Sequence, residues 1–193
     1  MTTRTSGWRI ALGAICGAIV WVGLTGCAET AARAPVGTAG FASSTVDIGI
    51  VVSDIERSAA FYKHALGLTE LPGFDVPEAM AGDAGLSAYK PFHVRVFVTS
   101  NSPKATKIKL MQFTDTTGKS QDNAFIHSTL GYSYLTVFVT DMTAAVERAK
   151  KAGALPIAKG PVPLPPGFPK GVYLALVRDP DGNLIELVGP KAE

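Results

Sequence analysis

The chain contains two copies of one strand–helix unit, and this repeat limits most strongly what it can fold into. The first copy runs from Val46 to Tyr62 and the second from Ser133 to Arg148. Each is an apolar stretch, then a Ser-Asp or Thr-Asp pair, then residues at helical spacing. Because one such unit cannot bury its apolar face alone, the two copies are expected to share one core or one cleft.

The patterns around the two copies predict the same order of elements twice. Each helix is expected to be capped by its Ser/Thr-Asp pair, so by Ser53 or Asp54 in the first copy. Pro72-Gly73 is expected to end a strand, and residues 74–90 to form a loop. The predicted strands are 47–52, 68–71, 92–99 and 107–113, then 131–139, 155–158, 172–177 and 184–188. This predicts an α+β domain over residues 45–190, built from two β-α-β-β-β modules at 45–113 and 131–190.

The first 26 residues are expected to be a targeting segment rather than part of the fold. Arg4 and Arg9 precede an uncharged apolar run at 10–24, which is shorter than the roughly 20 residues of a comfortable transmembrane helix. The run ends in Leu24-Thr25-Gly26-Cys27, which resembles a bacterial lipobox. We therefore expect lipid on Cys27 and a domain anchored in the cell envelope; an uncleaved N-terminal anchor is the alternative.

Residues 27–44 are rich in Ala, Gly, Thr and Ser and are expected to be a flexible tether. Ala28 stands where some lipoproteins carry an Asp that retains them in the inner membrane, so the outer membrane is favoured if the cell has two membranes. Arg4 and Arg9 account for the whole formal charge of +2, so the rest of the chain is balanced. Without a clustered basic face, no nucleic-acid partner is expected.

A tight turn and the strand after it carry a resemblance to a known family. Asp179-Pro180-Asp181-Gly182 is a turn sequence in which Pro sets φ and Gly accepts a positive φ, and it leads into the apolar stretch 184–188. Together with the run from Val52 to Leu68, it resembles the vicinal oxygen chelate superfamily, which includes glyoxalase I, extradiol dioxygenases and bleomycin- and fosfomycin-resistance proteins. The resemblance spans roughly residues 46–190 and implies two modules that form a cupped mixed sheet around a central cavity.

In that family's metalloenzymes, four ligands, usually His and Glu, come from the first and last strands of both modules. The resemblance places Asp47, Lys109, Tyr134 and Glu186 at these positions. A protonated Lys accepts no bond and neutral Tyr is a poor ligand, so no cofactor is expected and a divalent metal is disfavoured. We expect instead that Asp47 and Glu186 hold Lys109, with Tyr134 hydrogen-bonded nearby.

The family pattern also directs four apolar side chains into the cup, where they would contact a ligand: Val94, Val96, Leu174 and Leu176. With that alternation, His93 and Arg95 face away from the cup; the opposite alternation would make them cavity residues. His64 is expected on a solvated helix surface and His127 in the connector between the modules.

Three functions remain open. The leading one is metal-independent binding of a small molecule by an envelope-anchored domain, similar to the resistance-type binders. The second is a lyase or isomerase acting on a carbonyl or carboxylate compound, with Lys109 binding a substrate oxygen and Glu186 or Asp47 acting as base. The third is a structural envelope protein whose cavity is filled by side chains. A homodimer is a further open alternative, because family members commonly pair modules across a dimer.

Overall fold

The structure is a computed structural model that describes residue 40, residues 42–115 and residues 118–192. From residue 42 onward the described residues belong to one compact unit. The predicted targeting segment and Cys27 lie outside the described residues. In the described part of the chain, no helix is both long and apolar enough to cross a membrane.

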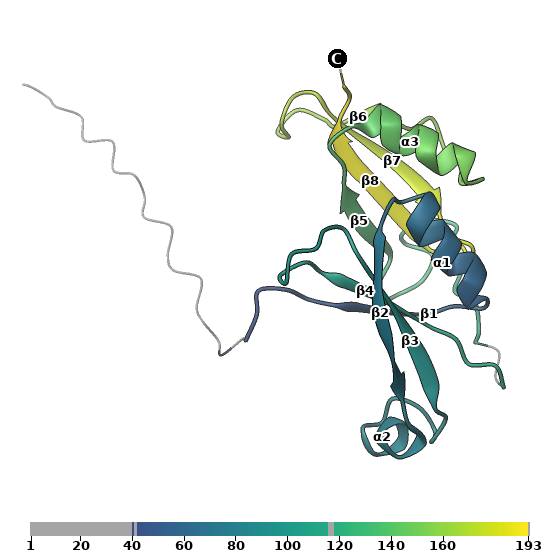
Figure 1. Ribbon diagram of the computed structural model, residues 1–193. Helices are drawn as coiled ribbons and strands as arrows, with labels where there is room; N and C mark the ends of the chain where they lie inside the picture. The colour runs from purple at the N-terminus through teal and green to yellow at the C-terminus, as the bar shows by residue number, and fades with distance from the viewer. Residues whose placement is uncertain (1–39, 41, 116–117, 193) are drawn as a thin grey trace, which may run out of the picture. The chain divides into compact units, whose positions relative to one another are not determined.

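The first module forms a four-stranded sheet, called sheet 1, in the order β1-β4-β3-β2. Strand β1 runs parallel to β4, and the other neighbours are antiparallel (Figure 1). Its elements are β1 (Ile48–Val51), α1 (Ile55–His64), β2 (Thr69–Val76), α2 (Glu78–Asp83), β3 (Phe92–Val98) and β4 (Lys107–Met111).

The second module repeats this arrangement as sheet 2, in the order β5-β8-β7-β6 with β5 parallel to β8. Its elements are β5 (Tyr134–Phe138), α3 (Met142–Lys151), β6 (Val162–Pro163), β7 (Val172–Arg178) and β8 (Leu184–Pro190). The two modules confirm the predicted α+β fold of two β-α-β-β-β units.

An aspartate begins each long helix by accepting hydrogen bonds from its first turn. Asp54 Oδ1 lies 3.0 Å from the backbone nitrogens of both Glu56 and Arg57. Asp141 Oδ1 does the same in α3, at 2.8 Å from the nitrogen of Thr143. These carboxylates satisfy N–H groups that have no partner inside the helix, so Asp54, not Ser53, is the cap of α1.

One hydrophobic core spans both modules on the helix side of the two sheets. Helix α1 and sheet 1 contribute Tyr62, Phe97 and Leu110, while α3 and sheet 2 contribute Met142 and Ile185. All five side chains are less than 2% exposed. Because strand residues alternate between faces, Val94 and Val96 point to the side of sheet 1 opposite Phe97. Each sheet therefore keeps one face for the shared core and one face for other contacts.

The prediction that Pro72-Gly73 ends a strand is wrong. Strand β2 continues through these residues to Val76, with an irregularity in its pairing to β3 between Leu71 and Phe74. A bulge of this kind takes up residues that cannot join the regular ladder, so the strand bends and goes on. The residues expected to form a loop at 74–90 contain the end of β2 and the short helix α2.

The short strand predicted at 155–158 is also displaced. Pro156 has no N–H to donate, and in this stretch the Ile157 nitrogen bonds the Leu176 oxygen at 3.0 Å without forming a strand. The edge strand is β6, at Val162–Pro163, which pairs with Tyr173 and Leu174 of β7. Proline is tolerated there because the outer side of an edge strand needs no donor.

The bulge in β2 makes a testable prediction at Gly73. A Cβ added there would lie 2.2 Å from the Val94 carbonyl oxygen, which is backbone and cannot move aside cheaply. Gly73→Ala should lower the free energy of unfolding by roughly 1–3 kcal/mol through overpacking. The matched control is Gly118→Ala, because no atom lies within 4 Å of the added Cβ. Urea denaturation measures both, and equal stability of the two variants would contradict the close approach.

Candidate functional site

On the face of sheet 1 opposite α1, a lysine and an aspartate form an ion pair. Lys109 of β4 lies across from Gly49 of β1 and Val96 of β3. Its Nζ is 2.9 Å from Asp47 Oδ2, and each side chain is 31% exposed. The hydrogen bond from Lys109, helped by the Lys107 backbone N–H, holds the pKa of Asp47 below its usual value. The pair therefore stays charged and its two charges offset each other.

At the equivalent place in sheet 2, a glutamate is bonded to a threonine. Glu186 of β8 lies across from Thr136 of β5, and Thr136 Oγ1 donates to Glu186 Oε2 at 2.7 Å. Both residues are half-buried. Tyr134 stands two residues earlier on β5 with 52% of its surface exposed. The two modules thus place different chemistry at matching positions.

The expected four-residue cluster is only partly assembled. Asp47 and Lys109 meet, but in the described part of the chain no ion pair joins Lys109 to Glu186, and no hydrogen bond fixes the Tyr134 hydroxyl. The expectation that Glu186 and Tyr134 help to hold Lys109 is therefore corrected. Gly49 offers no side chain opposite Lys109, so the lysine reaches Asp47, whereas Glu186 has Thr136 directly across the strand pair.

The four apolar residues expected to contact a ligand differ in exposure between the two modules. Val94 and Val96 are 2% and 4% exposed and pack in a cluster with Val76, Ala81 of α2 and Phe92. Because the protein's own side chains cover both valines, the structure leaves them little surface for a ligand. In sheet 2, by contrast, Leu174 and Leu176 are half-buried and share the face of Glu186. Ligand contact by any of the four stays a prediction.

The remaining polar residues of β3 face the helix side, as the predicted alternation requires. Arg95 Nε lies 2.7 Å from Glu70 Oε1, and its Nη1 lies 2.8 Å from Glu56 of α1. The Arg95 guanidinium holds the pKa of Glu70 below its usual value. His93 Nδ1 lies 2.7 Å from Asp75. His64 and His127 are exposed, and the His127 ring stacks on Phe125, so the three histidines lie in separate places.

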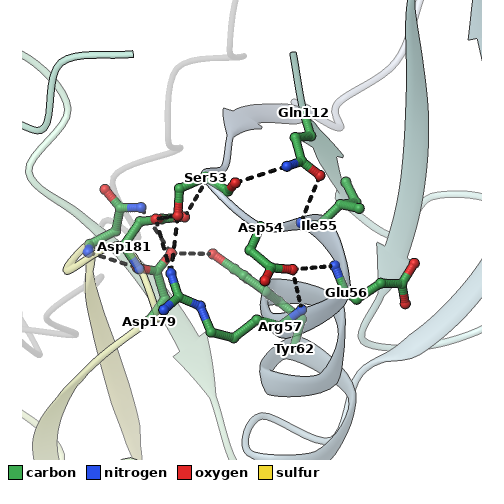
Figure 2. A network of polar contacts seen from close by, with 10 residues as sticks. Ser53, Asp54, Ile55, Glu56, Arg57, Tyr62, Gln112, Asp179 and Asp181 are labelled. Carbon is green, nitrogen blue, oxygen red and sulfur yellow. Dashed lines mark hydrogen bonds and ion pairs between the residues drawn. The ribbon is translucent and has the colours of Figure 1, made fainter. Parts of the chain in front are cut away.

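Sequence reasoning missed a polar network that joins the modules (Figure 2). Asp179, in the turn between β7 and β8, is 5% exposed. Its Oδ1 accepts from the backbone nitrogens of Asp181 and Asn183 at 3.0 and 2.8 Å. Its Oδ2 accepts from Asn183 Nδ2 at 2.8 Å and from the Tyr62 hydroxyl of α1 at 3.3 Å. Burial, together with this carboxylate, raises the pKa of Tyr62 far above its usual value.

The same turn also binds the start of α1. The Ser53 backbone nitrogen donates to Asp181 Oδ2 at 3.1 Å, and the Ser53 hydroxyl bonds the other oxygen of that carboxylate. Arg57 Nη2 donates to Ser53 Oγ at 3.0 Å and lies 3.6 Å from Asp181 (Figure 2). Gln112, just after β4, fixes the segment from the other side through the Ser53 carbonyl and the Ile55 nitrogen. The motif residues that carry the family resemblance thus join one module to the other.

Two cavities lie on the helix side of the molecule. One, of about 490 Å³, lies between α1, the end of α3 and the β7–β8 turn, and its lining includes Phe61, Ala154 and Arg178. The other, of about 210 Å³, lies where the end of α1 meets β5 and α3, and Arg148 lines it. None of the residues predicted to bind a ligand or to carry chemistry lines either of these two cavities.

The residues at the family's ligand positions do not fit a divalent metal. Among the described residues, no three His, Cys, Asp or Glu side chains gather closely enough to hold one ion. Of the four positions, one holds an ammonium that is already bound to the neighbouring carboxylate at 2.9 Å. A cation would have to displace that ammonium, which repels it and offers no lone pair.

The comparisons agree with the fold. The family model described as "Glyoxalase/Bleomycin resistance protein/Dioxygenase superfamily" matches residues 44–187. A glyoxalase family protein from Bacillus cereus superposes with a TM-score of 0.65 at 23% identity, covering 81% of this chain and 100% of that chain. A glyoxalase I mutant from Zea mays gives a TM-score of 0.54 at 15% identity, covering 77% of this chain and 45% of that chain. No curated protein sequence matches the chain.

The junction makes a prediction at Asp179. Asp179→Ala would leave the buried Tyr62 hydroxyl and the donors of the turn without their acceptor, so the free energy of unfolding should fall by roughly 2–5 kcal/mol. The control is Asp122→Ala, because Asp122 Oδ1 accepts one bond, from the Ala124 nitrogen, in an exposed turn. That change should stay within about 0.5 kcal/mol. Chemical denaturation measures the free energy of unfolding of both variants, and a similar decrease in the two would rule out a special role for the junction.

Proposed function

Because the chain belongs to the glyoxalase/bleomycin resistance protein/dioxygenase superfamily, we propose that its domain binds a small molecule without using a divalent metal. The observation that carries this proposal is the ion pair of Lys109 Nζ and Asp47 Oδ2 at 2.9 Å. The family resemblance implies metal ligands at these two positions. A protonated lysine has three donors and no acceptor, so this pair supports binding through hydrogen bonds and apolar contacts instead.

The residues on the non-helix faces supply what such binding needs. Small-molecule sites usually combine a mainly apolar surface with a few placed polar groups. Leu174 and Leu176 provide half-buried apolar surface, and Glu186 and Thr136 provide a carboxylate and a hydroxyl beside it. Lys109 supports the lyase or isomerase alternative less well, because Asp47 already binds the ammonium that would have to polarise a substrate oxygen.

We also propose that Cys27 carries a lipid that anchors the domain in the cell envelope, in the outer membrane of a cell with two membranes. The support is the sequence alone: a basic start, an apolar run and Leu24-Thr25-Gly26-Cys27. One acyl chain binds a membrane only weakly and reversibly, whereas two chains give a stable anchor. A diacylglycerol on Cys27 would therefore hold the domain at the membrane surface.

Metal analysis tests the proposed function. The full chain, purified in a non-ionic detergent and dialysed after exposure to Zn²⁺, Mn²⁺ or Ni²⁺, should retain much less than one equivalent of any of them. The reason is that Lys109 lies where a ligand would be needed. Elemental mass spectrometry gives the stoichiometry. One bound equivalent that disappears in Glu186→Ala but persists in Glu147→Ala, on the exposed surface of α3, would overturn the proposal.

Lipidation is tested by labelling cells with a radioactive fatty acid. The chain should incorporate label, and Cys27→Ala should abolish it, because the thiol is the group that takes the diacylglycerol. Cys16→Ala serves as the matched control and should leave the label unchanged, since Cys16 lies within the apolar run. Label that persists in the Cys27 variant would refute the anchor.

A further inference from the structure

One face of sheet 2 is largely apolar and stays partly exposed to solvent. We call it the open face of sheet 2 and define it by six residues that share a side with Glu186: Tyr134, Thr136, Phe138, Leu174, Leu176 and Val188. At one end of the same side lie Arg178 and Leu184, and Leu184 is buried. Phe138 is 81% exposed and Tyr134 52%. Residues on the other side of the same strands, such as Val177 and Ile185, are buried in the core that includes α3.

The matching face of sheet 1 is covered in part by the protein itself. Helix α2 follows β2 in the first module, and its Ala81 is fully buried among Val94, Val96 and Phe92. The second module passes from β6 through a proline-rich segment to β7 without a counterpart of α2. An exposed apolar surface of this kind is a common mark of a binding site. The difference between the modules thus points to sheet 2 as the binding surface.

Among the residues that the structure describes, the Glu186 carboxylate on this face has no cationic partner. Thr136 satisfies one oxygen of Glu186 at 2.7 Å, and in the described part of the chain no Lys, Arg or His forms an ion pair with this carboxylate. Arg178 lies on the same side of β7, but its guanidinium donates to the Gly182 and Ala124 carbonyl oxygens at 2.9 and 3.2 Å. Lys109 is neutralised by Asp47.

A half-buried carboxylate without a cation favours a ligand that brings one. A glutamate carboxylate only accepts hydrogen bonds, and a charge-assisted bond from an ammonium is stronger than a neutral one. Tyr134 and Phe138 stand two residues on either side of Thr136 on β5, so their rings flank the place where such a cation would lie. Aromatic faces attract cations, and this adds to the preference.

We propose that the open face of sheet 2 binds a small organic cation, an ammonium compound with an apolar body, whose charge pairs with Glu186. The inference rests on the proposed function and names its ligand class. The apolar body packs on Leu174, Leu176 and Val188, and the ammonium donates to the free oxygen of Glu186. The Glu186 carboxylate would repel an anionic ligand at this place.

Three probes with one apolar group test the proposal: benzylammonium, benzyl alcohol and benzoate. Each is titrated into the full chain in the same non-ionic detergent, with methyl NMR of Leu174, Leu176 and Val188 reporting the place of binding and calorimetry the affinity. Benzylammonium should bind about five- to tenfold more tightly than benzyl alcohol. Benzoate should bind most weakly of the three.

Glu186→Gln keeps the size of the side chain and an oxygen to accept from Thr136, but it removes the charge. It should abolish the preference for benzylammonium and leave the affinity for benzyl alcohol unchanged. Glu147→Gln, on the exposed surface of α3, should change neither affinity. Comparing variants in one detergent removes any contribution from partition of the probes into micelles.

The outcomes separate this inference from the proposed function. Binding of benzyl alcohol on the face without any preference for benzylammonium, or a preference that survives Glu186→Gln, overturns the cation proposal and leaves small-molecule binding standing. Failure of all three probes to shift these methyl signals contradicts both. A dimer seen by analytical ultracentrifugation, together with methyl signals that no probe shifts, would show that a second copy covers the face. This outcome also overturns the cation proposal.

Discussion

The Asp179 carboxylate is buried where the second module meets helix α1, and its four hydrogen bonds hold the turn and the Tyr62 phenol in one place. A buried carboxylate is costly unless it is fully bonded, so the turn, the helix and the sheet behind them must keep their positions together. The hydrophobic core that both modules share depends on this arrangement. The separation of each sheet into a core side and an opposite side follows from it.

The family's sequence motifs therefore have a structural use in this chain. Asp181 and Ser53 bond each other across the junction, and Arg57 joins them. None of these residues lies on the non-helix faces where Lys109 and Glu186 stand. A match to these motifs is good evidence for the fold and no evidence for a reaction, because the motif residues lie apart from the positions that would bind or react.

Local features were predictable from the sequence, and contacts between distant segments were not. The two aspartate caps and the alternation that places Val94 opposite Phe97 depend on neighbouring residues, and the structure has both. The bulge at Gly73 was missed because it involves pairing with another strand, whose Val94 carbonyl leaves no room for a Cβ there. The partner of Lys109 was predicted only in part for the same reason. Whether its ammonium contacts Asp47, Glu186 or both depends on distances between strands, which the sequence does not give. Helix α2 was missed because six residues give too short a pattern.

The sequence distance spanned by the junction has a consequence for how the protein is made. Tyr62 and Asp179 are 117 residues apart, and Ser53 and Asp181 are 128 apart. During synthesis or export from the N-terminal end, the first module emerges with Tyr62 lacking its hydrogen-bond acceptor and with half of its core absent. It cannot reach its final packing until nearly the whole chain is present, and contacts of such long range slow folding. The protein is thus most prone to misfolding at the stage when the chain is complete through β4 but not yet through β8.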